Sequence, residues 1–485
     1  MKKIIILILA GICQLSLVFA QTDIDALRYS QPGLAGTARY VSMGGAFGAL
    51  GGDFSSLAGN PAGIGIYRKS EFSFTPSIFV GGTKSTFFGN TDQENKFNFN
   101  LGNIGLVFTQ KLTNNEDGPG WKSWNFGFGY NRIANFNNRF FIEGFNPSNS
   151  MTNYFAEHAQ GTAPENLDPF SDLQAYNTYL INPVGGANDY EPAVLAGNIT
   201  QRMNDETSGS IGEMNFTFGG NYGNKLYLGG TLAFSSLRFN DESVYEEIDK
   251  TNQIDSLNRF EFDQTLHTRG SGVNLKFGMI YRIDEHVRLG IAVHTPTWYS
   301  MHDSWVNSTS SRFDAGENYF DDKNGTYDYQ LTTPFKALAS LAYVIGNQGL
   351  LSVDYEFMDP SQSRFDASTS GFADVNNAIR QKYAAINTLH AGMEWRIGDY
   401  SLRGGYVYST SPIDSRFKVS GYDFTKQSFC AGLGVRQDNM SIDLGYVYAI
   451  SNQYFVPYLP SSGEIPSSFE KVKNNNFTLT FGFKF

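Results

Sequence analysis

Apolar and polar residues alternate strictly at the end of the chain. In residues 477–485, FTLTFGFKF, every second position holds Phe or Leu, and the positions between them hold Thr, Gly or Lys. Successive side chains of a β-strand point to opposite faces, so one face of this segment is wholly apolar and the other is polar or small. The pattern predicts a strand that separates an apolar medium from a wet one.

The same alternation recurs along most of the chain. Residues 440–448 place Met, Ile, Leu, Tyr and Tyr on one face, and residues 273–281 do the same with Val, Leu, Phe, Met and Tyr. This periodicity predicts fourteen strands. Their ranges are 70–82, 97–111, 122–136, 211–223, 225–238, 260–283, 286–301, 326–345, 349–358, 386–397, 400–410, 426–436, 439–450 and 474–485.

The connections between these strands alternate in length. Short turns are expected at 223–224, 284–285, 346–348, 398–399 and 437–438, with 113–120 as a somewhat longer member of the same set. Long polar segments are expected at 137–210, 239–259, 302–325, 359–385, 411–425 and 451–473. Short turns on one side, long loops on the other and an even number of strands are typical of a bacterial transmembrane barrel. The predicted fold class is therefore all-β, an antiparallel transmembrane β-barrel of about 14 strands, because closure pairs every backbone group.

The composition favours alternating strands over a soluble globule. Mean hydropathy is −0.30, although aromatic residues make up 15% of the chain and glycine occurs 51 times. A polar average with abundant Phe and Tyr is expected when every second residue of a strand faces lipid. After residue 20, no apolar run approaches the roughly 18 residues that a membrane helix needs.

The first twenty residues predict a secretory signal peptide that is cleaved before Gln21. Lys2 and Lys3 precede a mostly apolar stretch that ends at the small residue Ala20. The chain carries 47 acidic and 36 basic side chains, and so acidic a protein is not expected to bind nucleic acid. Cys430 is the only cysteine after cleavage, so no internal disulfide is expected.

Residues 44–67, GGAFGALGGDFSSLAGNPAGIGIY, at first suggest a phosphate-binding loop. No Lys-Ser or Lys-Thr follows the glycines, and no helix is predicted for them to open. Small residues also let backbone pack closely against backbone. We therefore expect residues 21–68 to form a compact N-terminal plug inside the lumen of a barrel that spans residues 69–485.

The run GLAGTARYVSMGGAFGALGGDFSSLAGNPAGIGIY, residues 33–67, resembles the FadL/TodX-type outer-membrane transporters of long-chain fatty acids and other hydrophobic compounds. The resemblance implies that an N-terminal hatch plugs a barrel of fourteen strands. It assigns the hatch motif Asn-Pro-Ala to Asn60, Pro61 and Ala62. These residues also suit a rigid turn, because Pro fixes φ and Asn caps local backbone. The hatch motif and the rigid turn are compatible interpretations if the turn positions a plug that must shift to admit ligand.

Gly127 and Gly129 lie on the lumen face of the third predicted strand. The resemblance implies an inward kink of this strand that opens the wall sideways, and glycine weakens a strand where it bends. Tight packing of the two glycines against the plug is an equally good interpretation.

The remaining polar residues do not indicate catalysis or metal binding. His286, His294 and His302 share one face of a strand, but a spacing of eight residues spans about 26 Å. His302, Asp303 and Ser304 are adjacent in sequence, whereas catalytic triads are assembled in space. The acidic turn at 321–325 does not have the spacing of an EF-hand. Charged residues expected in the lumen, where they pair or line water, are Lys276, Arg282, Arg288, Asp354, Glu356, Glu394, Arg396 and Asp443.

The function expected from the resemblance is passive uptake of hydrophobic compounds, such as long-chain fatty acids, across the outer membrane of a Gram-negative bacterium. The protein is expected to be a monomer that contacts outer-membrane lipid and uses neither a cofactor nor a metal. Its last residue, Phe485, resembles the signal that the barrel assembly machinery reads. The alternative is a barrel of the same kind that shuttles secreted proteins to the cell surface. The sequence does not name the ligand.

Overall fold

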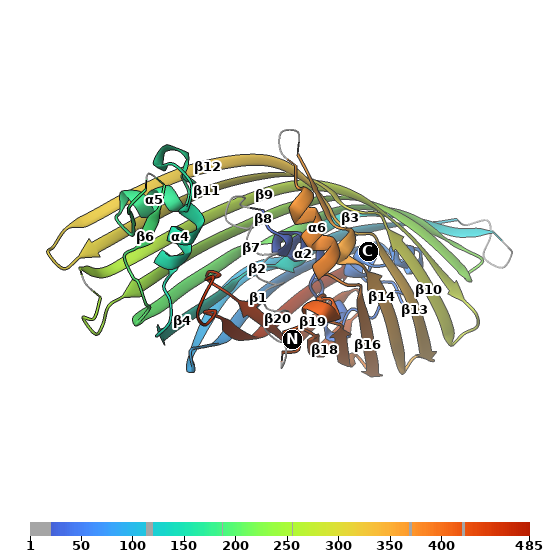
Figure 1. Cartoon of the computed structure of the whole chain (residues 1–485). Coiled ribbons are helices and arrows are strands. Elements are labelled where there is room, and N and C mark those ends of the chain that lie inside the picture. The colour runs from blue at the N-terminus through green and yellow to red at the C-terminus, as the bar shows by residue number, and fades with distance from the viewer. Residues whose placement is uncertain (1–20, 113–119, 187, 255, 368–370, 420–421) are drawn as a thin grey trace.

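The computed structural model describes residues 21–112, 120–186, 188–254, 256–367, 371–419 and 422–485. Within this part of the chain, fourteen antiparallel strands form a closed barrel (Figure 1). The signal peptide predicted over residues 1–20 lies outside the described residues, as does most of the turn predicted at 113–120.

Each barrel strand pairs with a neighbour on both sides along at least part of its length. In order around the ring, which we call the wall, the strands are β1 (Glu71–Phe87), β2 (Asn90–Lys111), β3 (Trp121–Asn135), β7 (Ile199–Tyr222), β8 (Leu226–Ile248), β9 (Leu257–Arg282), β10 (Val287–His294), β13 (Lys336–Ile345), β14 (Gly349–Met358), β16 (Ile386–Ile397), β17 (Tyr400–Ser409), β18 (Lys426–Gln437), β19 (Met440–Phe455) and β20 (Ser468–Lys484). β20 pairs with β1 and closes the ring. The predicted strand number and antiparallel barrel are confirmed.

The alternation of the strands places apolar side chains on the outer surface. Phe477, Phe481 and Phe483 of β20 are 46%, 42% and 46% exposed, whereas Thr478 and Thr480 between them are buried. Exposed apolar side chains of this kind occur on every strand of the wall. They form an outward-facing apolar belt around a polar interior, which is the arrangement of a transmembrane barrel.

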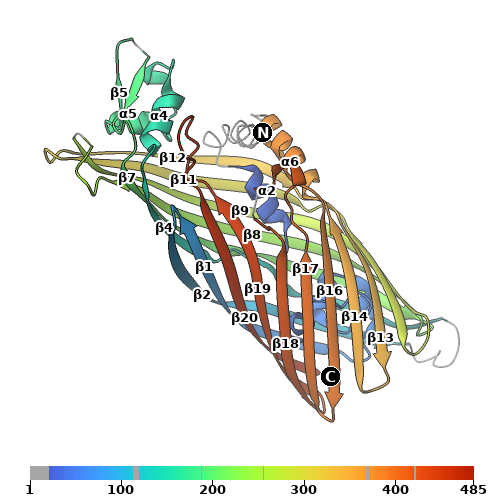
Figure 2. The same cartoon turned by 60° about the horizontal axis from the view of Figure 1, so that its bottom comes forward.

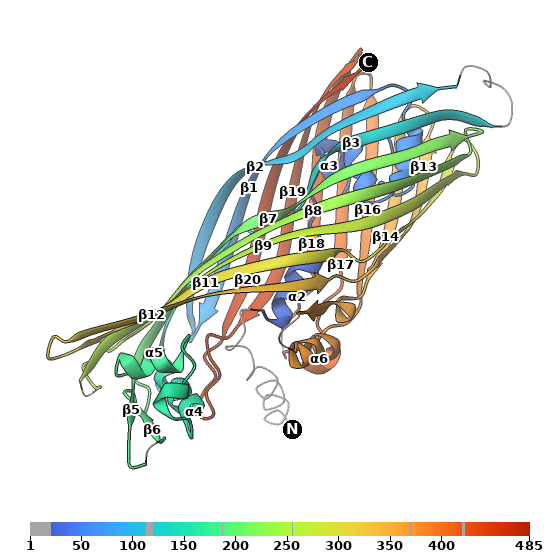
Figure 3. The same cartoon turned by 90° about the horizontal axis from the view of Figure 1, so that it is seen from above.

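Several strands are longer than the sequence pattern predicts. β7 and β8 continue through residues 199–210 and 239–248, which were predicted as loops. β11 (Trp298–Phe313) and β12 (Asn318–Thr332) fill much of the loop predicted at 302–325. These loop predictions are wrong because the extensions hold only scattered apolar residues, such as the buried Met203, Phe239 and Tyr245, so their sequence carries no regular apolar alternation. Figure 3 shows β11 and β12 projecting beyond the end of the barrel.

The long connections lie at one end of the barrel. β4 (Asn138–Asn146) leads to α4 (Met151–Ala159), η3 (Pro164–Asn166), α5 (Asp172–Asn177) and the hairpin of β5 (Ile181–Pro183) and β6 (Tyr190–Pro192). The other short elements are η4 (Pro360–Gln362), β15 (Arg364–Asp366), α6 (Ala373–Lys382) and η5 (Ser415–Phe417). In Figure 2, α4, α5 and α6 lie toward one end of the barrel and the C-terminus lies at the other. None of the helices in the described residues is long and apolar enough to cross a membrane.

Residues 21–68 form the segment that we call the plug. It contains α2 (Asp23–Ser30), α3 (Ala38–Ser42), η1 (Phe54–Ala58) and η2 (Pro61–Ile66). α2 contacts α6 at the loop end of the barrel, whereas η2 contacts β7, β8 and β9 where these strands approach the short turns. The plug therefore crosses the lumen from the loop end to the turn end.

Candidate functional site

The glycine-rich part of the plug brings backbone against backbone. A Cβ atom added at Gly51 would lie 2.5 Å from Gly63 Cα, and one added at Gly405 of β17 would lie 2.4 Å from Gly44 N. Gly51 and Gly44 also have φ angles of +60° and +64°, which favour glycine. A side chain would not fit at these positions, because the plug backbone lies in direct contact with itself at Gly51 and with the backbone of the wall at Gly405.

Asn60 ties the plug both to itself and to the wall. Its Oδ1 accepts a hydrogen bond from Ala62 N at 3.0 Å, which caps η2 at Pro61. Its Nδ2 donates to Gly48 O at 2.6 Å and to Met279 O of β9 at 3.3 Å. The Asn-Pro-Ala motif is therefore a capped turn that contacts the barrel, and its part in ligand uptake stays a prediction.

Three wall side chains donate hydrogen bonds to carbonyl oxygens of the plug. These bonds run from His294 Nε2 to Gly59 O (2.6 Å), from Lys276 Nζ to Ala58 O (3.2 Å) and from His390 Nδ1 to Gly44 O (2.7 Å). Because a carbonyl oxygen can only accept a hydrogen bond, Nε2 of His294 and Nδ1 of His390 must each carry a proton. The plug backbone is thus held by β10, β9 and β16.

A buried network of charges joins the plug to the wall near the short turns. Arg39 Nε of α3 lies 2.7 Å from Glu394 Oε2, and Arg403 Nε lies 2.8 Å from the same oxygen. Arg403 also contacts Asp443 at 2.6 Å, and Arg396 contacts Glu394 at 2.8 Å. The predicted pairing of inward charges is confirmed for these residues, and for Lys276 with Glu213 and Glu356 with Lys336.

The histidines that are spaced by eight residues make separate contacts. His286 stacks on Tyr343, and His302 Nδ1 lies 2.7 Å from Asp328 Oδ1. Among the residues that the structure describes, no three His, Cys, Asp or Glu side chains are arranged to hold a metal ion. The contacts of His286 and His302, like that of His294 with the plug, are structural.

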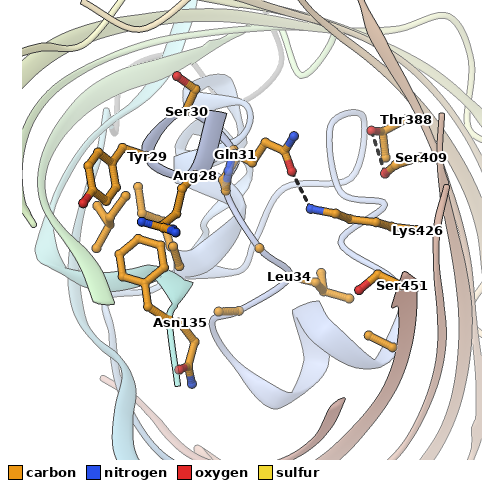
Figure 4. Close-up of a pocket in the computed structure, with 18 of the residues that line it drawn as sticks. Arg28, Tyr29, Ser30, Gln31, Leu34, Asn135, Thr388, Ser409, Lys426 and Ser451 are labelled. Carbon is orange, nitrogen blue, oxygen red and sulfur yellow. Dashed lines mark hydrogen bonds between the residues drawn. The ribbon is translucent and has the colours of Figure 1, made fainter. Parts of the chain in front are cut away.

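A cavity of about 940 Å³ lies between the plug and the wall, toward the loop end. Its apolar lining includes Leu34, Phe79, Phe136, Phe239, Val407 and Val447. Ligand pockets in proteins typically measure roughly 300–1,000 Å³, so this cavity is large enough for an extended amphiphile. Figure 4 shows polar residues approaching it from both sides, with Gln31 of the plug facing Lys426 of the wall.

Lys426 is one of the basic residues that line this cavity. Its Nζ donates a hydrogen bond to Gln31 Oε1, a neutral partner. None of the ion pairs among the described residues includes Lys426. Lys426 was not among the candidate residues predicted from the sequence, although the alternation of the strand at 426–436 already places position 426 on the lumen face with Cys430.

The ladder between β2 and β3 stops part-way up the wall. The last paired residues are Asn103 and Asn131, and among the described residues β2 pairs above this point with β1 alone. β4 continues β3 but pairs only with β7. Side chains bridge the interruption, as when Lys96 of β2 contacts Glu206 of β7 at 2.8 Å. The interruption borders the cavity, since Asn100 and residues 131–138 line it.

Gly127 and Gly129 lie below this interruption and are paired on both sides. Each is in register with a residue of β2 and a residue of β7. A Cβ added at Gly127 would lie 3.0 Å from Ile64 Cδ1, and one added at Gly129 would lie 2.7 Å from Phe54 Cζ. Both glycines therefore pack closely against the plug. The kink expected at these residues stays a prediction, and the ladder ends two residues further on.

Comparisons with known proteins place the fold. No protein-family model and no curated protein sequence matches the chain. A FadL homologue of Pseudomonas aeruginosa is 10% identical, and the match covers 94% of this chain and 100% of that chain with a TM-score of 0.58. The chain has the FadL/TodX barrel fold.

Two hydrocarbon channels share this FadL/TodX fold. The toluene transporter TodX of Pseudomonas putida is 12% identical, with 93% of this chain and 99% of that chain covered and a TM-score of 0.54. The monoaromatic hydrocarbon channel CymD is 11% identical, with 93% and 98% covered and a TM-score of 0.51. The fold implied by the sequence resemblance is therefore confirmed.

Proposed function

We propose that the protein is a passive channel for hydrophobic compounds, such as long-chain fatty acids, in the outer membrane of a Gram-negative bacterium. The observation that carries this proposal is the cavity of about 940 Å³, which combines apolar walls with the ammonium of Lys426. An acyl chain suits the apolar lining. A carboxylate suits a lysine whose hydrogen-bond partner is a neutral amide.

The proposed route leads from the outer loops into the cavity and then past the plug. Two exits are available beside it. In the first, the plug shifts, and Asn60, Pro61 and Ala62 form the turn that positions it. In the second, the ligand leaves sideways through the interruption between β2 and β4. Gly127 and Gly129 would let β3 bend where the second exit begins. Neither route requires an energy source, a catalytic residue or a cofactor.

The remaining parts of the proposal concern the path to the membrane. The apolar belt of the wall suits insertion as a monomer into lipid. A signal peptide over residues 1–20 would deliver the chain across the inner membrane. Phe485, at the end of β20, would be read by the barrel assembly machinery. The shuttle function is the rival, and the lined cavity favours transport because a protein shuttle does not need one.

Uptake of labelled dodecanoate by cells that express the protein tests the proposal. We expect uptake above that of cells without it, and about tenfold weaker binding of dodecanoate by Lys426→Met, since a charged hydrogen bond is lost. Binding of toluene, which has no charge, should not change in this variant. A stoichiometric protein that co-purifies with the barrel, together with no dodecanoate uptake, would support the shuttle instead.

A further inference from the structure

The cavity is also lined by a cluster of three carboxyl groups, those of Asp205 of β7, Asp241 of β8 and Glu470 of β20. All three line the cavity, and Glu470 and Asp205 are only 2% and 9% exposed. Asp205 is in register with Ser243 of β8, and Asp241 is in register with Thr207 of β7, so the two aspartates are diagonal neighbours on one face of the ladder. Glu470 lies near enough to Asp205 to repel it electrostatically. Three carboxyl groups from three strands therefore meet at one side of the cavity. We call them the acidic subsite.

The position of β4 explains why these strands meet. Thr83 Oγ1 of β1 donates to Asn138 Oδ1 of β4 at 2.6 Å, so β4 lies against β1 as well as pairing with β7. On β20, Val472 is in register with Thr83 of β1, and Glu470 is in register with Ser85, two residues further along the same ladder. β7, which carries Asp205, pairs with β4, and β4 lies against β1, which is the partner of β20. The displaced β4 thus brings Asp205 and Glu470 to the same side of the cavity.

Within the described residues, no cation lies in ion-pair contact with the acidic subsite. No ion pair there includes Asp205, Asp241 or Glu470. The guanidinium of Arg28 contacts Asp25 at 2.6 Å and covers the ring of Phe239 at 4.2 Å, and it interacts electrostatically with Asp205 and Asp241 from a greater distance. Glu470 is therefore the carboxyl group of the subsite that is farthest from any compensating cation.

Two oxygens of the subsite also have no donor. Among the described residues, Glu470 Oε1 and Asp241 Oδ1 are buried without a hydrogen-bond partner. Buried oxygens of this kind are normally satisfied, so their orientation into a cavity points to a donor that the ligand brings.

The arrangement of the carboxyl groups selects among cations. The three groups do not form a set that holds a metal ion. A primary ammonium is larger and carries three N–H donors that point in different directions, so it can reach separated oxygens. An amine on the ligand fits the acidic subsite better than a metal does.

Lys426 and the acidic subsite lie close enough to contact one ligand head. Lys426 directly precedes Gln427, which is in register with Ile450 of β19, so Lys426 lies beside Ser451, and Ser451 is in register with Val472 of β20. Glu470 is two residues from Val472 on the same face. Two ladder steps of about 4.8 Å and two residues of about 3.3 Å separate the Cα atoms of Lys426 and Glu470 by about 12 Å. Both side chains then extend into the cavity and shorten that distance.

We propose that the preferred substrate is a zwitterionic amphiphile, an acyl chain whose head carries both a carboxylate and a primary ammonium. Lys426 receives the carboxylate, the acidic subsite receives the ammonium, and the apolar lining receives the chain. This inference rests on the proposed transport function and makes its substrate class more specific. A simple fatty acid would use only half of the polar lining.

Binding of three probes with twelve-carbon chains to the purified full-length barrel in a non-ionic detergent tests the inference. The probes are Nε-lauroyl-lysine, which has both charges, dodecanoate and dodecylamine. We expect Nε-lauroyl-lysine to bind about tenfold more tightly than either of the others, because it forms one additional hydrogen bond between charged groups. Glu470→Gln and Asp205→Asn should weaken the binding of Nε-lauroyl-lysine and dodecylamine about tenfold and leave dodecanoate unchanged.

Lys426→Met is the matched variant for the opposite charge. It should weaken the binding of Nε-lauroyl-lysine and dodecanoate and leave dodecylamine unchanged. Heat-modifiable migration of each variant confirms a folded barrel, and Asp241→Asn replaces any acidic variant that fails this check. Dodecanoate that binds as tightly as Nε-lauroyl-lysine, with no effect of the acidic variants, overturns the inference and leaves the proposed transport intact. Absence of binding by all three probes overturns both.

Discussion

Arg39 of the plug and Glu394 of the wall form an ion pair of 2.7 Å between Nε and Oε2, deep inside the barrel. Glu394 is 1% exposed and also contacts Arg403 and Arg396. The carboxylate therefore keeps cationic partners when Arg39 is removed, whereas the plug loses its charged contact with β16. A plug that moves must break this bond, and the wall need not change when it does.

Arg39→Met should loosen the plug without unfolding the barrel. We expect a loss of about 1.5–3 kcal/mol of plug–wall interaction, the usual value of a hydrogen bond between charged groups. Protease cleavage within residues 21–68 should become faster, and conductance across a planar bilayer should rise. Arg364→Met, which removes an exposed loop contact with Asp366, is the control. Equal cleavage rates in the two variants would show that Arg39 does not retain the plug.

Asn60→Ala should impair ligand uptake while the barrel still assembles. The variant loses the cap on Ala62 N and both donated bonds, to Gly48 O and to Met279 O. Loss of such a cap typically costs about 0.5–2 kcal/mol, and the wall ladders do not depend on it. Uptake of labelled dodecanoate is measured at equal surface amounts, beside Pro61→Ala. Normal uptake in both variants would show that the Asn-Pro-Ala motif is only a structural turn with no part in uptake.

The strands could be predicted from the sequence because lipid imposes a rule on every second residue. Phe477 and Thr478 differ in exposure as the alternation requires. The rule ends where the strands extend beyond the apolar belt and carry only scattered apolar residues, such as Phe239 and Tyr245 of β8, so the strand extensions in β8 and β11 were assigned to loops. The sequence of these extensions has no regular periodicity from which a strand could be predicted.

The cavity was harder to predict because its residues come together only through the closed ring. Lys426 and Gln31 are 395 positions apart, yet they share a hydrogen bond. Asp205 and Glu470 meet because β4 lies against β1, and the asparagines near residues 135–138 fit a turn as well as a displaced strand. The motif Asn60, Pro61 and Ala62 was found because it is local.

The contact between α4 and α5 in the outer loop should depend on pH. His158 Nδ1 lies 2.6 Å from Asp172 Oδ2, and this hydrogen bond raises the pKa of His158. A raised histidine pKa gives stabilisation that is complete below the unfolded value of about 6.5 and is lost as pH rises through the folded value. Burial raises the pKa of Asp172 despite the same bond, but a carboxylate titrates at lower pH.

Hydrogen exchange of the α4 amides, corrected for intrinsic rates, measures this effect. Protection should fall as pH rises above the ordinary histidine pKa of about 6.5. His158→Gln should have low protection both below and above this pKa, because it cannot acquire the charge. Protection that is independent of pH in the unmodified protein would contradict the assignment of the stabilisation to His158.

The exit route can be tested at Asn100, which lines the cavity from the part of β2 that pairs with β1 alone. If ligand leaves sideways between β2 and β4, Asn100→Trp should block uptake of dodecanoate while the purified variant still binds it. The control is Asn476→Trp, which adds the same bulk to the same cavity from β20. Asn476 is paired with both β1 and β19, so no exit passes beside it. Equal uptake by the two variants at equal binding would exclude the sideways route and leave movement of the plug as the exit.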